Sequence, residues 1–549
     1  MDRLPQRAEI GLQRGPGNRQ KDGHSSATSV GSAVWPRNLK RLVFSSSMPV
    51  NTVSWPASLQ QLELGGSFNQ PIADPIVGVV WPASLQQLWF GATFNQPIIG
   101  VAFLVSLQEL SLGNSFNQPI ADVAWPPCLQ QLSFGYKFNQ PIVDVMWPAS
   151  LQQLSVGFKF NQPVVRVTWP PFLEKLSLGH SFNQSIIEVV WPTSLKQLSF
   201  GNGFNKRIIE VVWPSSLQRL SFGGKSDRPV LGEAKFNQPI DRVVWPPCLQ
   251  QLSLGYKFNQ SIVNVTWPAS LQQLSFGFEF NQPVVRVTWP PFLEQLSLGD
   301  SFNQSIIEVV WPTSLKQLSF GNGFNKRIIE VVWPSSVQRL SFGGEFNQPI
   351  AGVVWPPRLQ QLSFGFAFNQ SILQVVWPTS LQQLSFDSFN QPIADVDWPI
   401  SLQQLWFGNK FNQPLVGVVW PTSLQRLSFG DKFNQPPIAN VVWPASLEQL
   451  LFGDTFNQPI TDVAWPASTK ELSFGSASAS PSVGPSGRSR CNTYRLVSSS
   501  SRPFGWVFPA TSPLPTSPDR YPYNTCGLEM HSTNPLSDSC GRAPCSGHR

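Results

Sequence analysis

The chain has 549 residues, of which 41% are hydrophobic and only 13% are charged, about half the usual charged share. Its formal net charge is +7, but residues 1–33 contribute +2 and residues 476–549 contribute +4, so the middle carries only +1. This balance argues against a basic nucleic-acid surface in the middle of the chain. No apolar run approaches the roughly 20 residues that span a bilayer, so no membrane segment is expected.

Residues 1–33 are polar and rich in Gly, Arg and Ser, and they lack the apolar core of a secretory signal. This composition predicts a disordered, basic N-terminal segment. Cys128 and Cys248 stand at matching places of a repeat, and the other four cysteines follow residue 490. The arrangement is not that of a disulfide framework, so an intracellular, cytoplasmic location is expected.

From residue 34 to residue 475 one 22-residue unit recurs about twenty times, in the form W-P-x-S-L-Q-Q-L-S-F-G-x-x-F-N-Q-P-I-x-x-V-V. One copy is degenerate at Phe103-Leu104, and ten extra residues, 225–234, interrupt the run. Residues 125–224 recur nearly unchanged as residues 245–344. A fixed period of this length predicts one elongated domain of stacked repeats, in which each unit contacts only its neighbours.

The unit predicts a β-solenoid rather than a helical array, because two prolines in each typical unit leave no room for a helix. Leu151 and Leu154 begin the L-x-x-L-x-apolar pattern of a leucine-rich-repeat strand, whose buried residues alternate with solvent-facing ones. Gly157 then predicts a sharp turn with a positive φ. The expected fold is a parallel β-solenoid of about 20 coils, similar to leucine-rich repeats (LRRs), between disordered tails.

The second half of the unit predicts how successive coils are joined. Phe160 is expected to return to the core, and Trp147 to fill the corner before the next strand. Asn161 is expected to be buried and to bond to the backbone of the adjacent coil, which would form a ladder along the stack.

These residues resemble the FNIP repeat, an LRR-like module with the pattern S-L-x-x-L-x-F-G-x-x-F-N-x-P-I. Residues 150–164 and 270–284 fit this pattern nearly throughout, and the resemblance extends over about 34–475. The Val-Val-Trp-Pro corner departs from the family, which more often has leucine before the proline. The resemblance implies an interaction array without catalytic residues.

Residues 476–549 are rich in Ser, Pro and Gly and predict a disordered tail. The cysteines and histidines of this tail match no standard zinc module, so no metal or cofactor is predicted. Of the four histidines, only His180 lies in the repeats, and no cluster of catalytic residue types interrupts the pattern. The chain is therefore not expected to be an enzyme.

The candidate binding residues are departures from the Gln-Gln-Ser surface expected on the strands. Trp89, Trp406 and Leu451 each replace the serine, and exposed tryptophans are frequent interface anchors. The sequence therefore predicts a non-enzymatic scaffold that binds a protein partner through its strand face. The alternative is a structural protein that adsorbs to a polysaccharide or ice surface. A third possibility is repeat expansion without a selected function.

Overall fold

The described part of the chain comes from a computed structural model and belongs to one compact unit. It comprises residues 7–10, 494–496 and 35–475, the last range without 46, 48, 52, 74–78, 224–234, 436–437 and 461. The chain divides into units 1–498 and 499–549, and every described residue lies in the first. The segments expected to be disordered, 1–33 and 476–549, lie outside the described residues except for one short strand each.

The described residues form twenty-two short strands, which lie in one sheet. The first eleven are β1 (Arg7–Ile10), β2 (Arg41–Phe44), β3 (Gln61–Leu64), β4 (Gln87–Phe90), β5 (Glu109–Leu112), β6 (Gln131–Phe134), β7 (Gln153–Ser155), β8 (Lys175–Ser177), β9 (Gln197–Phe200), β10 (Arg219–Phe222) and β11 (Gln251–Ser253). The others are β12 (Gln273–Ser275), β13 (Gln295–Ser297), β14 (Gln317–Ser319), β15 (Arg339–Phe342), β16 (Gln361–Phe364), β17 (Gln383–Phe386), β18 (Gln404–Phe407), β19 (Arg426–Phe429), β20 (Gln449–Leu451), β21 (Glu471–Phe474) and β22 (Tyr494–Leu496).

Each strand pairs in parallel with the next strand along the chain, and like residues face like residues. Leu154 of β7, for example, is in register with Leu132 of β6 and Leu176 of β8. Strands β2–β21 supply the twenty coils, which confirms the predicted LRR-like parallel β-solenoid. β1 and β22 pair with β2 and β21 and extend the sheet at its two ends.

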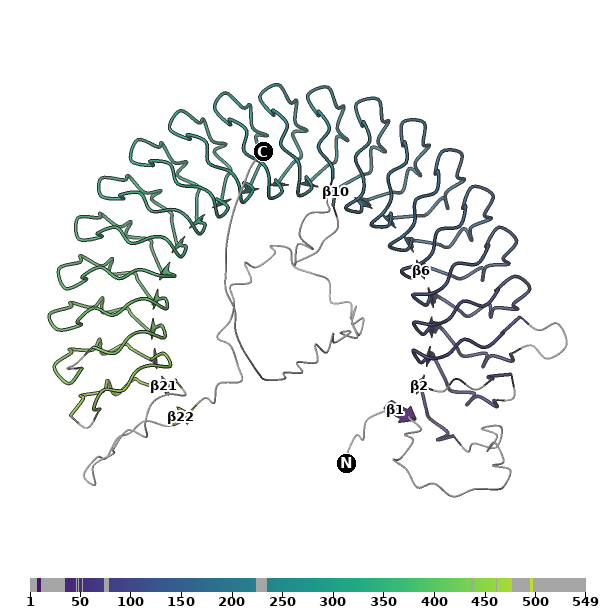
Figure 1. Cartoon of the computed structure of the whole chain (residues 1–549), viewed down its shortest axis with the longest axis horizontal. Helices are drawn as coiled ribbons and strands as arrows, with labels where there is room; N and C mark the ends of the chain where they lie inside the picture. The colour runs from purple at the N-terminus through teal and green to yellow at the C-terminus, as the bar shows by residue number, and fades with distance from the viewer. Residues whose placement is uncertain are drawn as a thin grey trace, which may run out of the picture. The chain divides into compact units, whose positions relative to one another are not determined.

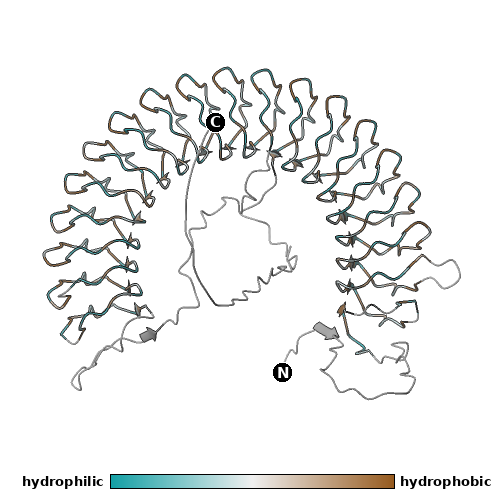
Figure 2. Ribbon diagram, viewed as in Figure 1, coloured by the Kyte–Doolittle hydropathy of each residue, from teal (hydrophilic) through white to brown (hydrophobic). Residues whose placement is uncertain are grey.

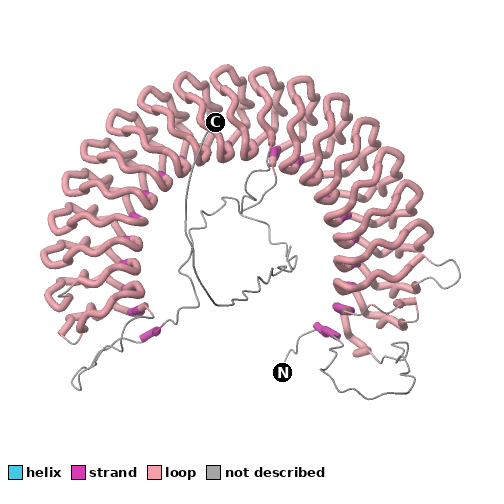
Figure 3. The backbone as a smooth tube through the Cα atoms, in the orientation of Figure 1, coloured by secondary structure: helices cyan, strands magenta, loops and turns pink. Residues whose placement is uncertain are grey.

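Each coil consists of a short strand followed by turns and extended loop, as Figure 3 shows. In Figure 1 successive coils follow an arc, and the strands line its inner side. The turn before a strand and the turn after it necessarily lie on opposite flanks of the sheet. In the coil 147–168 these turns are at residues 149–150 and 158–159, and a third turn at 165–166 is the outer tip.

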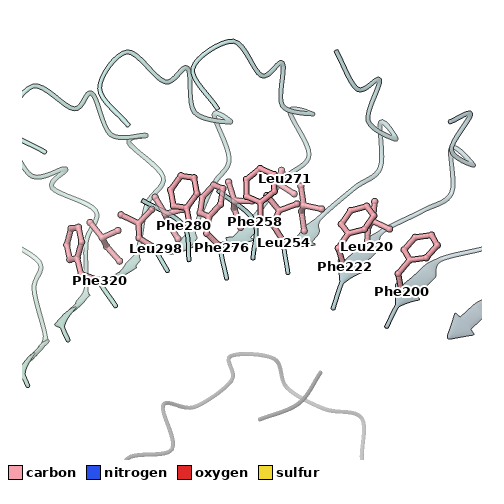
Figure 4. Packing of buried hydrophobic residues seen from close by; sticks show 14 of the residues in the cluster. Phe200, Leu220, Phe222, Leu254, Phe258, Leu271, Phe276, Phe280, Leu298 and Phe320 are labelled. Atoms are coloured by element: carbon pink, nitrogen blue, oxygen red, sulfur yellow. The ribbon is translucent and has the colours of Figure 1, made fainter. Parts of the chain in front are cut away.

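The core is a set of parallel rows, one side chain per coil. Leu151, Leu154, Val156 and Phe160 are each at most 4% exposed, and their equivalents recur in the other coils. Neighbouring phenylalanine rings of this row lie 6.1–6.2 Å apart, as between Phe160 and its neighbours on either side. Figure 4 shows such leucine and phenylalanine side chains side by side behind the strands, and Figure 2 shows hydropathy alternating along each coil.

The tryptophans form a second row, with Trp147 packed against Trp125 at a ring separation of 6.1 Å. Trp147 is half-buried, and most other members of the row are buried. Trp35 donates a hydrogen bond to the carbonyl of Ser54, but seventeen other indole N–H groups are buried without an acceptor among the described residues. Ring stacking and burial therefore hold this row together.

The prediction of a positive φ at Gly157 is wrong, because the positive-φ glycines are Gly100, Gly223, Gly352 and Gly417. Glycine is required at this position by the closeness of the preceding coil. A Cβ atom on Gly157 would lie 1.9 Å from the carbonyl oxygen of Gly135, and glycines of other coils meet the same contact. Adjacent backbones thus touch along a row of glycines beside the strands.

The asparagine ladder is confirmed, although its members are half-buried rather than buried. The side-chain Oδ1 of Asn139 accepts a 2.8 Å hydrogen bond from the backbone N–H of Asn161, and Asn161 accepts the same bond from Asn183. Gln162 adds a bond from its amide to the carbonyl of Asn139. The asparagine side chain of each coil therefore accepts a hydrogen bond from a backbone N–H of the next coil.

Candidate functional site

The solvent-facing side of the sheet, here called the strand face, carries rows of uncharged polar side chains. In the coil 147–168 these are Gln152, Gln153 and Ser155, which are exposed or half-buried. Because the parallel register stacks like on like, Ser155 lies beside Ser133 and Ser177. The regular part of this face can accept and donate hydrogen bonds.

Charged residues on the strand face pair with each other between neighbouring coils. Lys196 lies 2.7 Å from Glu174, and the second copy of the block repeats this ion pair between Lys316 and Glu294. These side chains are 40–47% exposed, so each pair contributes only about 0.2–1 kcal/mol. The pairing leaves no net charge at these coils in the second copy, whereas in the first copy Lys175 on β8 adds a positive charge.

Trp89 on β4 is held by its neighbours rather than presented freely. Its indole N–H donates a 2.8 Å hydrogen bond to Glu109, whose other carboxylate oxygen accepts one from Gln87. The guanidinium of Arg41 lies 6.0 Å from the ring centroid and 3.8 Å from Glu63. The polar end of Trp89 is thus already satisfied, which makes it a weaker anchor for a partner than the sequence predicts.

Trp406 and Leu451 lie close together on the sheet. Trp406 on β18 is in register with Ser428 on β19, and Ser428 is in register with Leu451 on β20. Two strand spacings separate them, about 10 Å, and both are half-buried. No described residue accepts a hydrogen bond from the indole N–H of Trp406, and Arg426 is exposed beside it on β19. The structure thus brings these two predicted residues together and leaves Trp89 far away on β4.

Sequence reasoning missed a stack of aromatic rings at the turns after the strands. The rings of Tyr136 and Phe158 are 4.5 Å apart, and those of Phe158 and His180 are 4.0 Å apart. In the second copy Tyr256 stacks on Phe278 at 4.8 Å. The available signal was an aromatic residue directly after the glycine in consecutive coils.

A second missed feature is the residue immediately before each tryptophan. In the coil that ends at Val190, this side chain is 83% exposed, whereas Val189 is 5% exposed. The signal was the Val-Val pair of the unit, in which extended backbone turns only one side chain inward.

No arrangement for metal binding occurs in the described part of the chain, where no three His, Cys, Asp or Glu residues lie together. A hollow of about 640 Å³ between two coils is lined mainly by valine, proline, threonine and tryptophan, with Arg166 and Glu188 as its charged residues. The described residues also include no helix with the length and hydrophobicity needed to traverse a bilayer.

Comparisons with known proteins identify the repeat. The FNIP Repeat family profile matches at 94–137, 116–159, 160–203, 182–225, 236–279, 280–323, 324–367, 368–410, 411–442 and 437–477. Among solved structures, CroV588, described as a novel circular LRR protein structure, is 40% identical, with a TM-score of 0.69. The match covers 81% of this chain and 67% of CroV588.

A more distant structure shows the fold alone. The chain in the TLR13–ssRNA13 complex is 16% identical with a TM-score of 0.52, over 80% of this chain and 68% of that one. No curated protein sequence matches this chain. The matched repeats, the twenty-coil sheet and the similarity to CroV588 agree, and the chain belongs to the FNIP repeat family.

Proposed function

We propose that this protein is a non-enzymatic scaffold that binds a protein partner through its strand face. The observation that carries the proposal is the pair Trp406 and Leu451, two apolar side chains that flank Ser428 on adjacent strands. Interface anchors are enriched in tryptophan, and a half-buried indole with a free N–H can contribute both apolar contact and a hydrogen bond.

The low net charge of the repeats favours a protein over a nucleic acid as the binding partner. The repeats carry a net charge near +1, whereas binding to a phosphate backbone depends on several cationic contacts. The TLR13 chain is described in a complex with single-stranded RNA, but its likeness to this chain extends to the fold alone. We also propose an intracellular location, because Cys128 and Cys248 are free and exposed, as in reducing compartments.

The test restores the regular strand face. Trp406→Ser combined with Leu451→Ser introduces the serine that most other strands carry, so the fold is expected to stay intact. We expect capture of the partner by the full-length chain, measured by quantitative mass spectrometry, to fall at least tenfold, as for loss of an interface anchor.

The matched control is Phe366→Ser, which removes an exposed aromatic ring away from the strand face. This variant is expected to capture the partner as well as the wild type does. Equal capture by the Trp406→Ser, Leu451→Ser variant would contradict the proposal.

A further inference from the structure

One flank of the repeat array presents a row of exposed side chains, most of which are apolar. We call the five residues from the one before each tryptophan to the third one after it the tryptophan flank, as in residues 190–194. Its first residue is exposed by 76–84% at Val80, Met146, Val190, Val212, Val244, Val310, Val332, Val354, Val376, Val419 and Val442. Thr168, Thr266 and Thr288 occupy the same exposed position in other coils.

The tryptophan flank is almost without charge. Arg37 lies in the first coil, and from residues 54–58 to residues 464–468 the charged residues are Arg358 and Asp397, of which Asp397 stands in the exposed row. At the 13% charged share of the whole chain, roughly twelve would be expected in these nineteen coils. Large uncharged apolar surfaces of this kind mark interaction sites in proteins.

The opposite flank has a different character. The two residues after each strand glycine, here called the glycine flank, include Lys137, Lys159, Glu279 and Asp300. These residues are exposed or half-buried on the turns that follow the strands. Because the two flanks belong to the same coils, exposure alone does not explain why one of them lacks charge.

We propose that two copies of this protein associate through their tryptophan flanks. The exposed row has an apolar side chain in eleven coils and a threonine in three others, and the array of coils that carries it is curved in Figure 1. The tryptophan rings beside it recur every 6.0–6.4 Å. A partner that follows the row along its length needs the same period and the same curvature, and a second copy has both.

The symmetry of such a pair follows from the curve. A two-fold axis that is parallel to the plane of the arc and to its bisector, and that lies at the level of the tryptophan flank, turns one copy over and lays its tryptophan flank on that of the other. The N-terminal coils of one copy then face the C-terminal coils of the second copy, and the same patch is used by both, as in most protein dimers.

The exposed area is sufficient for a stable dimer. A fully exposed valine offers on the order of 100 Å² of apolar surface, so eleven side chains that are 76–84% exposed offer about 900 Å² per copy. Stable interfaces bury about 800 Å² per partner. The strand face with Trp406 and Leu451 remains free in this dimer, so the inference is independent of the proposed function.

The test places charge at the middle of the row. Val244→Lys combined with Val310→Lys alters two side chains that are 78% and 83% exposed, so the monomer fold is not expected to change. Sedimentation velocity on the full-length chain over about 1–100 μM should show a dimer of the wild type. The variant should dissociate at least a hundredfold more readily, because each lysine would be buried without a partner.

The matched control places two lysines on the glycine flank, as Phe278→Lys with Phe366→Lys, and should leave the dimer intact. A wild type that stays monomeric at 100 μM, or a dimer that only the control variant disrupts, would overturn the proposal. A monomer that adsorbs to ice or to insoluble polysaccharide, and loses this property with Val244→Lys and Val310→Lys, would overturn it as well and assign the flank to such a surface.

Discussion

Residues 125–224 and 245–344 are two copies of the same five coils, and their differences show which surfaces are free to change. The copies differ at Phe134/Leu254, Pro141/Ser261, Asp144/Asn264, Met146/Thr266, Val156/Phe276, Lys159/Glu279, Lys175/Gln295, His180/Asp300 and Leu217/Val337. The glycine, asparagine and tryptophan rows are identical in both copies. The contacts between coils are therefore the constant part of the block.

Two of the three buried differences compensate along a row, whereas the third, Leu217/Val337, has no counterpart. In the first copy Phe134 is followed one coil later by Val156, and in the second Leu254 is followed by Phe276. All four side chains are at most 6% exposed. A phenylalanine and a smaller residue have changed places between adjacent coils, so the volume of the row is nearly conserved, which protein cores tolerate.

Of the six differences at exposed or half-buried positions, two lie on the glycine flank, Lys159/Glu279 and His180/Asp300. Lys159 lies 5.8 Å from the ring of Tyr136 in the first copy, whereas its counterpart Glu279 lies 3.3 Å from Lys257 in the second. The tryptophan flank changes only from Met146 to Thr266, and neither residue is charged. The comparison teaches that charge varies on one flank and stays absent from the other.

The largest expected loss of stability comes from substitutions in the glycine row, and it should be equal in the two copies. Gly157→Ala and Gly277→Ala would place a Cβ atom 1.9 Å and 2.1 Å from the preceding glycine carbonyl oxygen. Each substitution should lower the free energy of local unfolding by about 2–3 kcal/mol, since backbone must move. Hydrogen exchange of peptides from the altered coils measures this loss.

Gly66→Ala is the control for these variants, because no atom lies within 4 Å of a Cβ at this position. It should change the free energy of unfolding by less than about 0.5 kcal/mol. A loss confined to one of the two copies would show that their coils are not packed alike.

A smaller effect of opposite sign is expected at the outer turns. Arg166 and Arg286 have φ values of 73° and 68°, in the region where Gly100 and Gly352 lie at equivalent places with 82° and 84°. Arg166→Gly or Arg286→Gly should stabilise either copy by about 0.5–1 kcal/mol, because relief of backbone strain exceeds the entropy cost of glycine. Calorimetry of the full chain measures the gain.

Glu188→Gly alters the same position one coil later, where φ is not positive. This control should destabilise the protein by about 0.5–1 kcal/mol. If Arg166→Gly and Glu188→Gly changed the stability in the same direction, the turn conformation would not depend on the residue at this position.

The smallest expected change in stability comes from the charge difference between Lys159 and its counterpart Glu279. Lys159→Glu should create in the first copy the pair that Lys257 and Glu279 form in the second, with a gain of up to about 0.5 kcal/mol. Glu279→Lys should remove this pair from the second copy and lower the stability by the same amount. Thermal unfolding at low salt and at about 1 M salt checks this, since high salt should abolish both shifts. Shifts that persist at high salt would exclude an electrostatic cause.

Much of the fold could be predicted because the contacts repeat with the sequence. Leu151, Leu154 and Phe160 are buried as expected, and the ladder of Asn161 follows from its recurrence in every coil. The role of Gly157 could not be predicted, because the distance between neighbouring backbones is absent from the sequence of one coil.

The candidate site was predicted less completely than the fold. Trp406 and Leu451 stand out as substitutions in a serine row, and their closeness follows from the register of β18–β20. The bond from Trp89 to Glu109 was missed because it is diagonal, between different positions of two coils. The exposed row at Val190 was missed because a Val-Val pair reads as core until the direction of each side chain is known.

The asparagine ladder continues without a break across the ten-residue insertion, and this bears on how the chain folds. The backbone N–H of Asn237 donates to Asn205, a contact that spans 32 positions, whereas the next rung from Asn259 to Asn237 spans 22. Closing the longer loop costs only about 0.3 kcal/mol more, since loop entropy grows with the logarithm of length. A coil can thus gain residues at a turn with little thermodynamic penalty, and the folding rate should depend on the span of one coil rather than on the length of the array.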